Sequence, residues 1–142
     1  MPDADKVFAV IDTNVIVSSF FSEDGTSFPA QVISAILCGS ITPLYNEEIL
    51  TEYQEVLSRP KFPFTEAQVE MMISAFKDFD INTIRVTAAD TSFPDPDDIV
   101  FYEVKMSKDD AYLVTGNIKH FPNTPFVVTP KEMMEILAVK KR

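Results

Sequence analysis

The chain has 142 residues, 46% of them hydrophobic and 24% charged, which is the composition of one globular domain and not of a disordered protein. Its formal net charge of −10 argues against broad electrostatic attraction to nucleic acid or to an anionic membrane surface. The acidic start "MPDADK" is unlike a secretory signal and no apolar stretch approaches the roughly 20 residues of a membrane helix, so we expect a cytoplasmic protein that makes no contact with membranes.

The first third of the chain predicts two strands and a helix between them. Residues 7–11 (VFAVI) form a continuous β-branched run, which is typical of a strand covered on both faces. Residues 29–39 predict a helix with Pro29 near its start, and the single cysteine, Cys38, is expected there as a small buried hydrophobe. Residues 41–44 (ITPL) predict a short, weak strand.

Two helices with recognisable N-terminal caps come next. Asn46 can cap a helix that runs to about Ser58, because its side-chain oxygen can accept a bond from a backbone N–H of the first turn. Thr65 and Gln68 have the spacing of a capping box, in which each side chain bonds the backbone N–H of the other residue. Both signals predict where a helix begins.

The second half of the chain continues the alternation. Short strands are predicted at 83–86 (TIRV), 111–115 (AYLVT) and 126–128 (FVV). A helix is predicted to open at "DPDD" with Asp95 as its cap, and Thr129 begins a terminal helix with a second capping box. Strands that alternate with helices predict an α/β fold with a mainly parallel central sheet.

Polar residues stand where two of the predicted strands end. The stretch "AVIDTNVIVSS" breaks its apolar run at Asp12, and Thr115, Gly116 and Asn117 come directly after the run "AYLV". Polar side chains inside a buried segment cost several kcal/mol unless their hydrogen bonds are satisfied, so the break needs a turn or a site to explain it. Because sites in parallel sheets lie beyond the carboxyl ends of the strands, we expect both groups to share a cleft.

Two further acids are candidates for the same cleft. Asp98 lies in the first turn of a predicted helix, where its alternative role is helix capping, which is worth roughly 1 kcal/mol. Glu52 borders the apolar face of the helix that begins after Asn46, and its alternative role is that of a solvated surface charge. Taken one at a time, the residues leave both alternatives open.

Four blocks of the sequence together resemble the PIN-domain family. In chain order they are "VIDTNVIVSSFFS", "NEEILTEYQEVLSRPKF", "DPDDIVFYEV" and "AYLVTGNIKHFPNTPFVVTPKEMMEIL". The resemblance is to the branch of toxin components of toxin–antitoxin pairs, and it implies a single PIN-like domain over residues 1–142. It further implies a three-layer α/β/α fold with a central, mainly parallel sheet, an acidic pocket at the sheet edge and a metal-dependent ribonuclease activity.

The resemblance also implies roles for individual residues. The catalytic and metal-binding acids are Asp12, Glu52 and Asp98, and Asn117 is a further metal-binding position at which the family usually has Asp. A second group supports these acids or recurs beside them, and it consists of Thr13, Asn14, Asp95 and Thr115. Lys119 and His120, directly after "TGN", are candidates for contacts with an RNA backbone, with a solvated loop as their alternative.

A pocket made of oxygen ligands suits Mg²⁺ or Mn²⁺, and the sequence has no Cys/His cluster that would indicate zinc. We therefore expect an endoribonuclease that hydrolyses phosphodiester bonds in single-stranded RNA, and a small antitoxin protein and a homodimer stay open as its partners. A haloacid-dehalogenase-type phosphatase is disfavoured, because it needs a second Asp where Asn14 stands. The main alternative is a degenerate PIN domain that only binds RNA or another protein, with Asn117 marking the loss of catalysis.

Overall fold

A four-stranded parallel sheet forms the centre of the protein. The computed structural model describes residues 7–78 and 98–140 of the chain. The strands lie in the order β2-β1-β3-β4, and each neighbouring pair is parallel. They are β1 (Val7–Ile11), β2 (Ile41–Leu44), β3 (Tyr112–Val114) and β4 (Val127–Val128). The predicted strands of these regions are confirmed, the last two in slightly shorter form.

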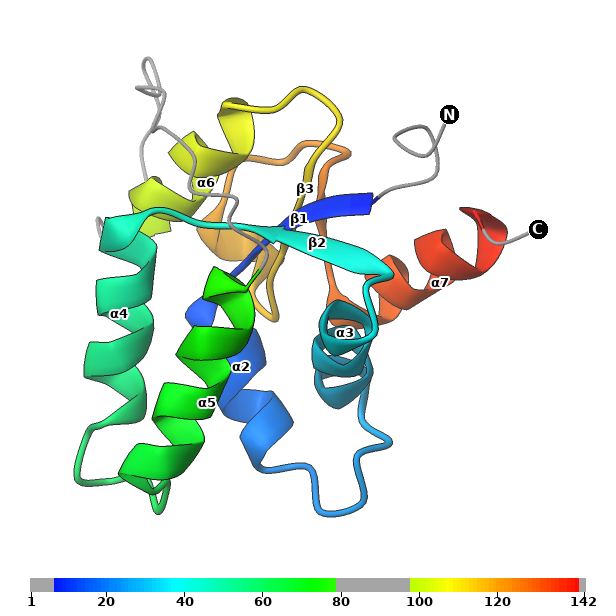
Figure 1. The fold of residues 1–142 in the computed structure, drawn as a ribbon. Helices are drawn as coiled ribbons and strands as arrows, with labels where there is room; N and C mark the ends of the chain where they lie inside the picture. Colours follow the sequence, from blue (N-terminus) through cyan, green and yellow to red (C-terminus); the bar gives the residue numbers. More distant parts are fainter. Residues whose placement is uncertain (1–6, 79–97, 141–142) are drawn as a thin grey trace.

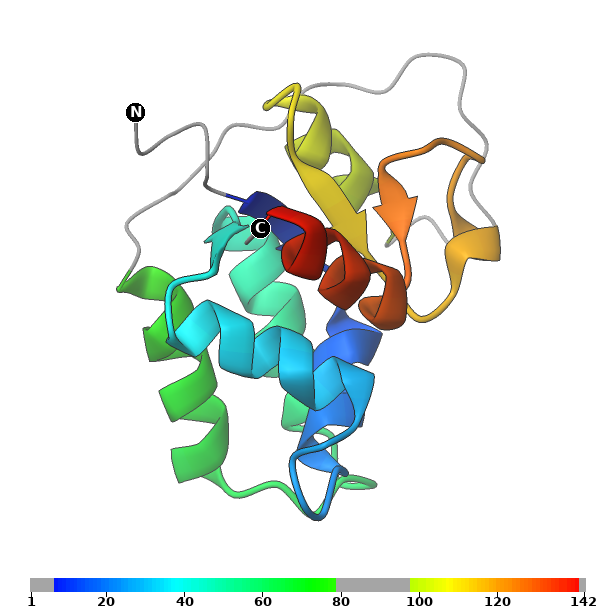
Figure 2. The same ribbon diagram turned by 90° about the vertical axis from the view of Figure 1, so that its right-hand side faces the viewer.

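Helices cover both faces of this sheet. The described residues form α2 (Thr13–Phe20), α3 (Phe28–Leu37), α4 (Glu47–Leu57), α5 (Glu66–Lys77), α6 (Ile99–Met106), α7 (Pro130–Lys140) and a short 3₁₀ helix, η2 (Ile118–His120). Figures 1 and 2 show α3 and α7 side by side over one face of the sheet and α6 on the opposite face. The expected α/β class with a parallel central sheet is therefore confirmed. Of the helices described, none has the length and apolar character needed to cross a membrane.

The two central strands are buried on both sides, which explains why their sequences are almost continuously apolar. In β1, Ala9, Val10 and Ile11 are fully buried, and in β3 the same holds for Leu113 and Val114. The two strands pair with Val10 opposite Leu113 and Ile11 opposite Val114, so they end at the same level. The residues that come directly after each strand are therefore brought together at one edge of the sheet.

The predicted helix starts are confirmed by their hydrogen bonds. The Ile49 N–H donates to Asn46 Oδ1 over 2.9 Å at the start of α4. The capping box of Thr65 and Gln68 is complete at α5. A second capping box links Thr129 and Glu132 at the start of α7, with bonds of 2.8 and 3.1 Å.

Two features of the N-terminal half differ from the sequence expectations. Residues 13–20 form α2 directly after Asp12, where the sequence predicted no helix; Val15 and Ile16 are buried and α2 packs against α3. Cys38 is exposed and not buried, because α3 ends at Leu37 and the chain turns outward there toward β2.

The helix that was predicted to open at Asp95 is described only from its later part. Asp98 is the residue immediately before α6, which begins at Ile99, and its backbone angles are already helical (φ −76°, ψ −19°), which agrees with a place in the first turn of the predicted helix. Asp95 and the strand predicted at 83–86 lie outside the described residues.

The cap of α4 can be tested because this helix carries Glu52. We expect Asn46→Ala to lower the free energy of unfolding by about 1 kcal/mol, since Asn46 is buried and the Ile49 N–H would lose its acceptor. Gln54→Ala, on the exposed face of the same helix, is the control and should change stability much less. Urea denaturation of both variants measures the effect, and equal stabilities would contradict the assigned cap.

Candidate active site

The ends of β1 and β3 meet at Asp12 and Thr115. The Asp12 N–H donates to the Val114 carbonyl and the Thr115 N–H donates to the Val128 carbonyl, each over 2.9 Å, so the parallel ladder continues past the strands. The Thr115 hydroxyl then donates to Asp12 Oδ2 over 2.7 Å. The shared edge expected from the sequence is thus present in the structure.

Further hydrogen bonds fix the orientation of these groups. The Asn117 N–H donates to Thr115 Oγ1 over 3.0 Å, so the hydroxyl proton of Thr115 is directed to Asp12. Asn14 Nδ2 donates to Asp12 Oδ2 over 3.1 Å, and Asn14 Oδ1 accepts the Gly116 N–H over 3.0 Å. The Asn14 side chain thus links Asp12, before α2, to Gly116, after β3. Asp12 Oδ2 accepts hydrogen bonds from both Asn14 and Thr115.

Asp98 is the second acid of the site. Its Oδ2 lies 3.3 Å from His120 Nδ1, and its side chain is 13% exposed. Asp98 repels the Asp12 carboxylate and His120 attracts it, which raises and lowers the pKa of Asp12 respectively. Asp12, Asp98 and His120 therefore share one electrostatic environment, although the sequence offered His120 only as a contact for RNA.

Both acids stand directly before a described helix, Asp12 before α2 and Asp98 before α6. Their side chains reach residues of the β3–β4 connection: Asp12 accepts a hydrogen bond from Thr115, and Asp98 lies beside His120. The capping role that the sequence left open for Asp98 concerns residues before 98, which lie outside the described part of the chain.

Burial dominates the charge state of Asp12. Its side chain lies in the protein interior, and burial raises its pKa from 3.8 to about 6. The hydrogen bond from Thr115 opposes this shift, the Asp98 charge adds to it, and the Thr13 backbone amide and His120 oppose it. Near neutral pH the folded protein thus carries a carboxylate that it holds at a cost in free energy.

Glu52 lies on α4, beside Tyr53, which connects α4 to the end of β1. The Tyr53 hydroxyl donates to the Ile11 carbonyl over 2.5 Å, and burial, Asp12 and Glu52 together raise the pKa of Tyr53 well above its usual range. Glu52 itself is half-buried and lines a shallow hollow on α4 with Glu48. The structure thus puts Tyr53 near Asp12 and Glu52. Among the described residues, it does not bring Glu52 together with Asp12 and Asp98 in one metal-binding group.

The other predicted residues lie around Asp12 in different ways. The Thr13 hydroxyl is buried without a hydrogen-bond partner in the described part of the chain, so this hydroxyl does not hold Asp12 as expected. The Asn117 side chain is exposed, and its link to the site is made by its backbone N–H. Lys119 is exposed on η2, and Asp95 lies outside the described residues.

The oxygen donors of Asp12 and Asp98 fit a hard divalent cation. Mg²⁺ is commonly bound by one or two carboxylates, with waters and substrate phosphates completing its shell. Among residues 7–78 and 98–140, no three His, Cys, Asp or Glu side chains are close enough to hold a metal ion together. The described side chains therefore offer two carboxylates to such an ion, and waters or substrate phosphates would complete its shell.

Comparison with protein families decides the family of this chain. A family model described as PIN domain matches residues 9–119, which include every site residue discussed above except His120. The chain belongs to the PIN domain family. PIN domains are generally nucleases and typically bind divalent metals. No curated protein and no solved structure was found to be similar to this PIN domain.

The raised pKa of Asp12 predicts how its replacement changes stability. Since the folded pKa exceeds the unfolded one, this group destabilises the folded state increasingly as pH rises from 3.8 to about 6. In EDTA near pH 7 we expect Asp12→Asn to raise the free energy of unfolding by about 1–2 kcal/mol, with the gain vanishing below about pH 4. Urea denaturation across this pH range measures the difference.

A matched control is Asp24→Asn, because hydrogen bonds from Thr26 lower the pKa of that exposed carboxylate. It should give no gain in stability near neutral pH. Destabilisation by Asp12→Asn, or a gain that does not depend on pH, would mean that Asp12 serves only as a turn residue.

Proposed function

We propose that this PIN domain hydrolyses phosphodiester bonds in single-stranded RNA, with Mg²⁺ or Mn²⁺ bound at Asp12 and Asp98. One observation carries the proposal: Asp12 and Asp98, which come directly before α2 and α6, share one electrostatic environment at the sheet edge, where the charge of Asp98 raises the pKa of Asp12. Two ionised carboxylates that repel each other are stabilised by a cation that both bind.

The orientation of Asp12 supports the proposal. Thr115 and Asn14 hold one oxygen of its carboxylate, so the group is positioned before any ligand binds. The buried Thr13 hydroxyl, which lacks a partner in the described residues, is a donor that a phosphate oxygen or a water molecule could use. The N-terminal ends of α2 and α6 add partial positive charge, which favours a phosphate there.

The chemistry of such a site needs no covalent intermediate on the protein. When bound, the ion supplies Lewis acidity and lowers the pKa of a water molecule so that it can attack the phosphorus. His120 lies 3.3 Å from the Asp98 carboxylate, and Lys119, the residue before it, is exposed and supplies a positive charge for the RNA backbone. The net charge of −10 makes such local cations necessary for binding a polyanion.

Glu52 and Asn117 enter the proposal on the resemblance of their sequence blocks. Glu52 is proposed as a third catalytic acid. This is supported by its place beside Tyr53, whose pKa is raised by the charges of both Asp12 and Glu52. Asn117 is proposed as a weak, neutral metal-binding position, supported by its bond to Thr115. The toxin role and a small antitoxin partner rest on the resemblance alone.

A second candidate function is a PIN domain that binds RNA or a protein without cutting RNA. Asn117 favours it, because an amide stands where the family usually has a carboxylate and the site therefore has one charge fewer for a second ion. The two candidates differ in whether RNA is cleaved, so one assay separates them.

The purified protein should cleave single-stranded RNA slowly with Mn²⁺ or Mg²⁺ and should not cleave it in EDTA. Without a cation, the carboxylates of Asp12 and Asp98 repel the negatively charged phosphate of the RNA. Asp12→Asn should lower the rate by about 100-fold or more. Glu135→Gln, an exposed acid on α7, is the control and should leave the rate unchanged. Gel analysis of a labelled RNA measures all three proteins.

Cleavage that persists in EDTA, or in Asp12→Asn, would refute a metal-dependent site at Asp12. If the protein binds RNA and leaves it intact with both metals, the second candidate function is the correct one.

Asn117→Asp provides an independent test of Asn117 as a metal-binding position. Replacing a neutral oxygen ligand by a charged one should tighten the binding of a second ion and raise the cleavage rate. Calorimetric titration with Mn²⁺ and the RNA assay measure the two effects. An unchanged stoichiometry together with an unchanged rate would remove Asn117 from the metal site.

A further inference from the structure

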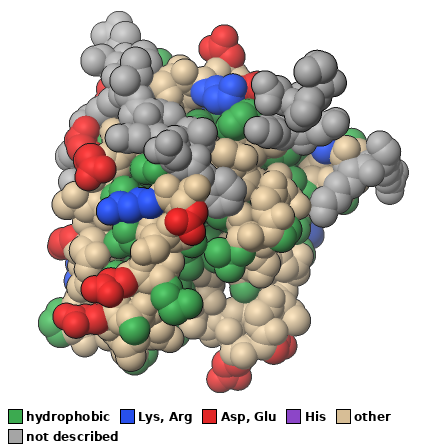
Figure 3. All heavy atoms as spheres, in the orientation of Figure 1, with side chains coloured by type: hydrophobic (Ala, Val, Ile, Leu, Met, Phe, Trp, Pro, Cys, Tyr) green, Lys and Arg blue, Asp and Glu red, His purple; other side chains and the backbone are tan. Residues whose placement is uncertain are grey.

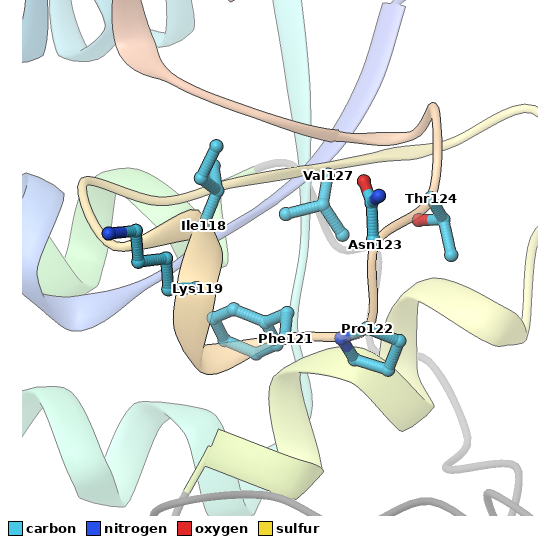
Figure 4. Close-up of a pocket in the computed structure, with 7 residues that line it drawn as sticks. All are labelled: Ile118, Lys119, Phe121, Pro122, Asn123, Thr124 and Val127. Atoms are coloured by element: carbon cyan, nitrogen blue, oxygen red, sulfur yellow. The ribbon is translucent and has the colours of Figure 1, made fainter.

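A pocket of about 300 Å³ lies in the connection between β3 and β4. Its apolar walls are formed by Ile118, Phe121, Pro122 and Val127, and its polar groups are Lys119, Asn123 and Thr124. Figure 4 shows the apolar side chains between Lys119 on one side and Asn123 and Thr124 on the other. The pocket thus has an apolar middle with a cation at one end and hydrogen-bonding groups at the other.

This pocket adjoins the candidate active site through η2. The same short helix carries Lys119 into the pocket lining and His120 to the Asp98 carboxylate, 3.3 Å away. The residue before η2, Asn117, bonds to Thr115 and thereby to Asp12. The pocket and the contacts to the two acids therefore share one short connection of the chain.

The chemistry of the lining narrows the class of ligand. Apolar walls with a few polar groups are typical of sites for small organic ligands, and this volume is at the lower end of their range. The Thr124 hydroxyl oxygen is buried and has no hydrogen-bond partner in the described residues, and the Asn123 amide is exposed and offers both a donor and an acceptor. A flat, partly apolar ring with hydrogen-bonding groups at its rim meets these demands.

The charge distribution adds a second constraint. On the face shown in Figure 3, acidic side chains are spread among apolar ones and lysines and arginines are sparse. Lys119 is exposed, and no acidic side chain within residues 7–78 and 98–140 forms an ion pair with it. Its ammonium group is therefore available to an anion at the mouth of the pocket.

We infer that this pocket binds one nucleobase of the RNA strand, adjacent to the phosphate held near Asp12 and Asp98. The base lies against Ile118 and Val127, its polar edge faces Asn123 and Thr124, and Lys119 contacts a backbone phosphate. The inference rests on the proposed function, since it names a subsite of the same RNA substrate. It makes the β3–β4 connection the segment that selects which base flanks the cut.

Binding can be measured without cleavage. The full chain, labelled with ¹⁵N, is titrated in EDTA with the 5′-monophosphates of adenosine, cytidine, guanosine and uridine, and separately with ribose 5-phosphate, which lacks a base. We expect at least one nucleotide to shift the amide signals of residues 118–127 and to bind more tightly than ribose 5-phosphate. Equal shifts with ribose 5-phosphate, or no shifts with any nucleotide, would overturn the inference.

Three variants and a control separate base from phosphate recognition. Ile118→Ala and Asn123→Ala, both at exposed positions, should each weaken nucleotide binding about fivefold while leaving ribose 5-phosphate unaffected. Lys119→Ala should weaken both ligands, and Lys131→Ala, an exposed lysine on α7, should change neither. Nucleotide binding that is unchanged in both Ile118→Ala and Asn123→Ala would overturn the inference.

Failure of this inference is distinguishable from failure of the proposed function. If nucleotides shift residues 118–127 but no RNA is cut, the base pocket stands and hydrolysis is refuted. If RNA is cut and the positions of the cuts are the same in Ile118→Ala and Asn123→Ala as in the wild type, hydrolysis stands and the base pocket is refuted.

Discussion

The buried carboxylate of Asp12 is the constraint around which this end of the protein is organised. An ionised carboxylate is expensive to bury, and the residues around it reduce that cost only in part, because its pKa remains raised to about 6. The Thr115 hydroxyl and the Asn14 amide hold its Oδ2, and each is in turn fixed by a backbone N–H. The cost that remains is the physical reason to expect a positively charged ligand at this place.

Much of the framework was predictable because its signals are local. The strand at 7–11 is indicated by a continuous, largely β-branched apolar run. The starts of α4, α5 and α7 are indicated by cap residues whose side chains accept a hydrogen bond from the backbone N–H three residues later. The meeting of Asp12 and Thr115 was also predictable, because the rule for parallel sheets turns two strand ends into neighbours. None of these inferences requires knowledge of how distant side chains pack.

The features that sequence reasoning missed depend on packing between distant segments. The β-branched residues after Asp12 favour a strand locally, and they form α2 because Val15 and Ile16 find a buried surface next to α3. The contact of His120 with Asp98 depends on how the β3–β4 connection folds back toward α6, and no spacing in the sequence encodes it. A lone histidine three residues after a strand-end "TGN" was a signal that a site lay near, but it did not identify the acid that the histidine contacts.

The hydrogen bond between Thr115 and Asp12 joins residues 103 positions apart in the chain. Contacts between such distant residues form late, because the entropy of closing a long loop must be overcome before the contact is gained. During synthesis, Asp12 leaves the ribosome long before Thr115, which follows β3, has been added. The hydrogen bond that orients the Asp12 carboxylate can therefore form only when the last third of the polypeptide is present.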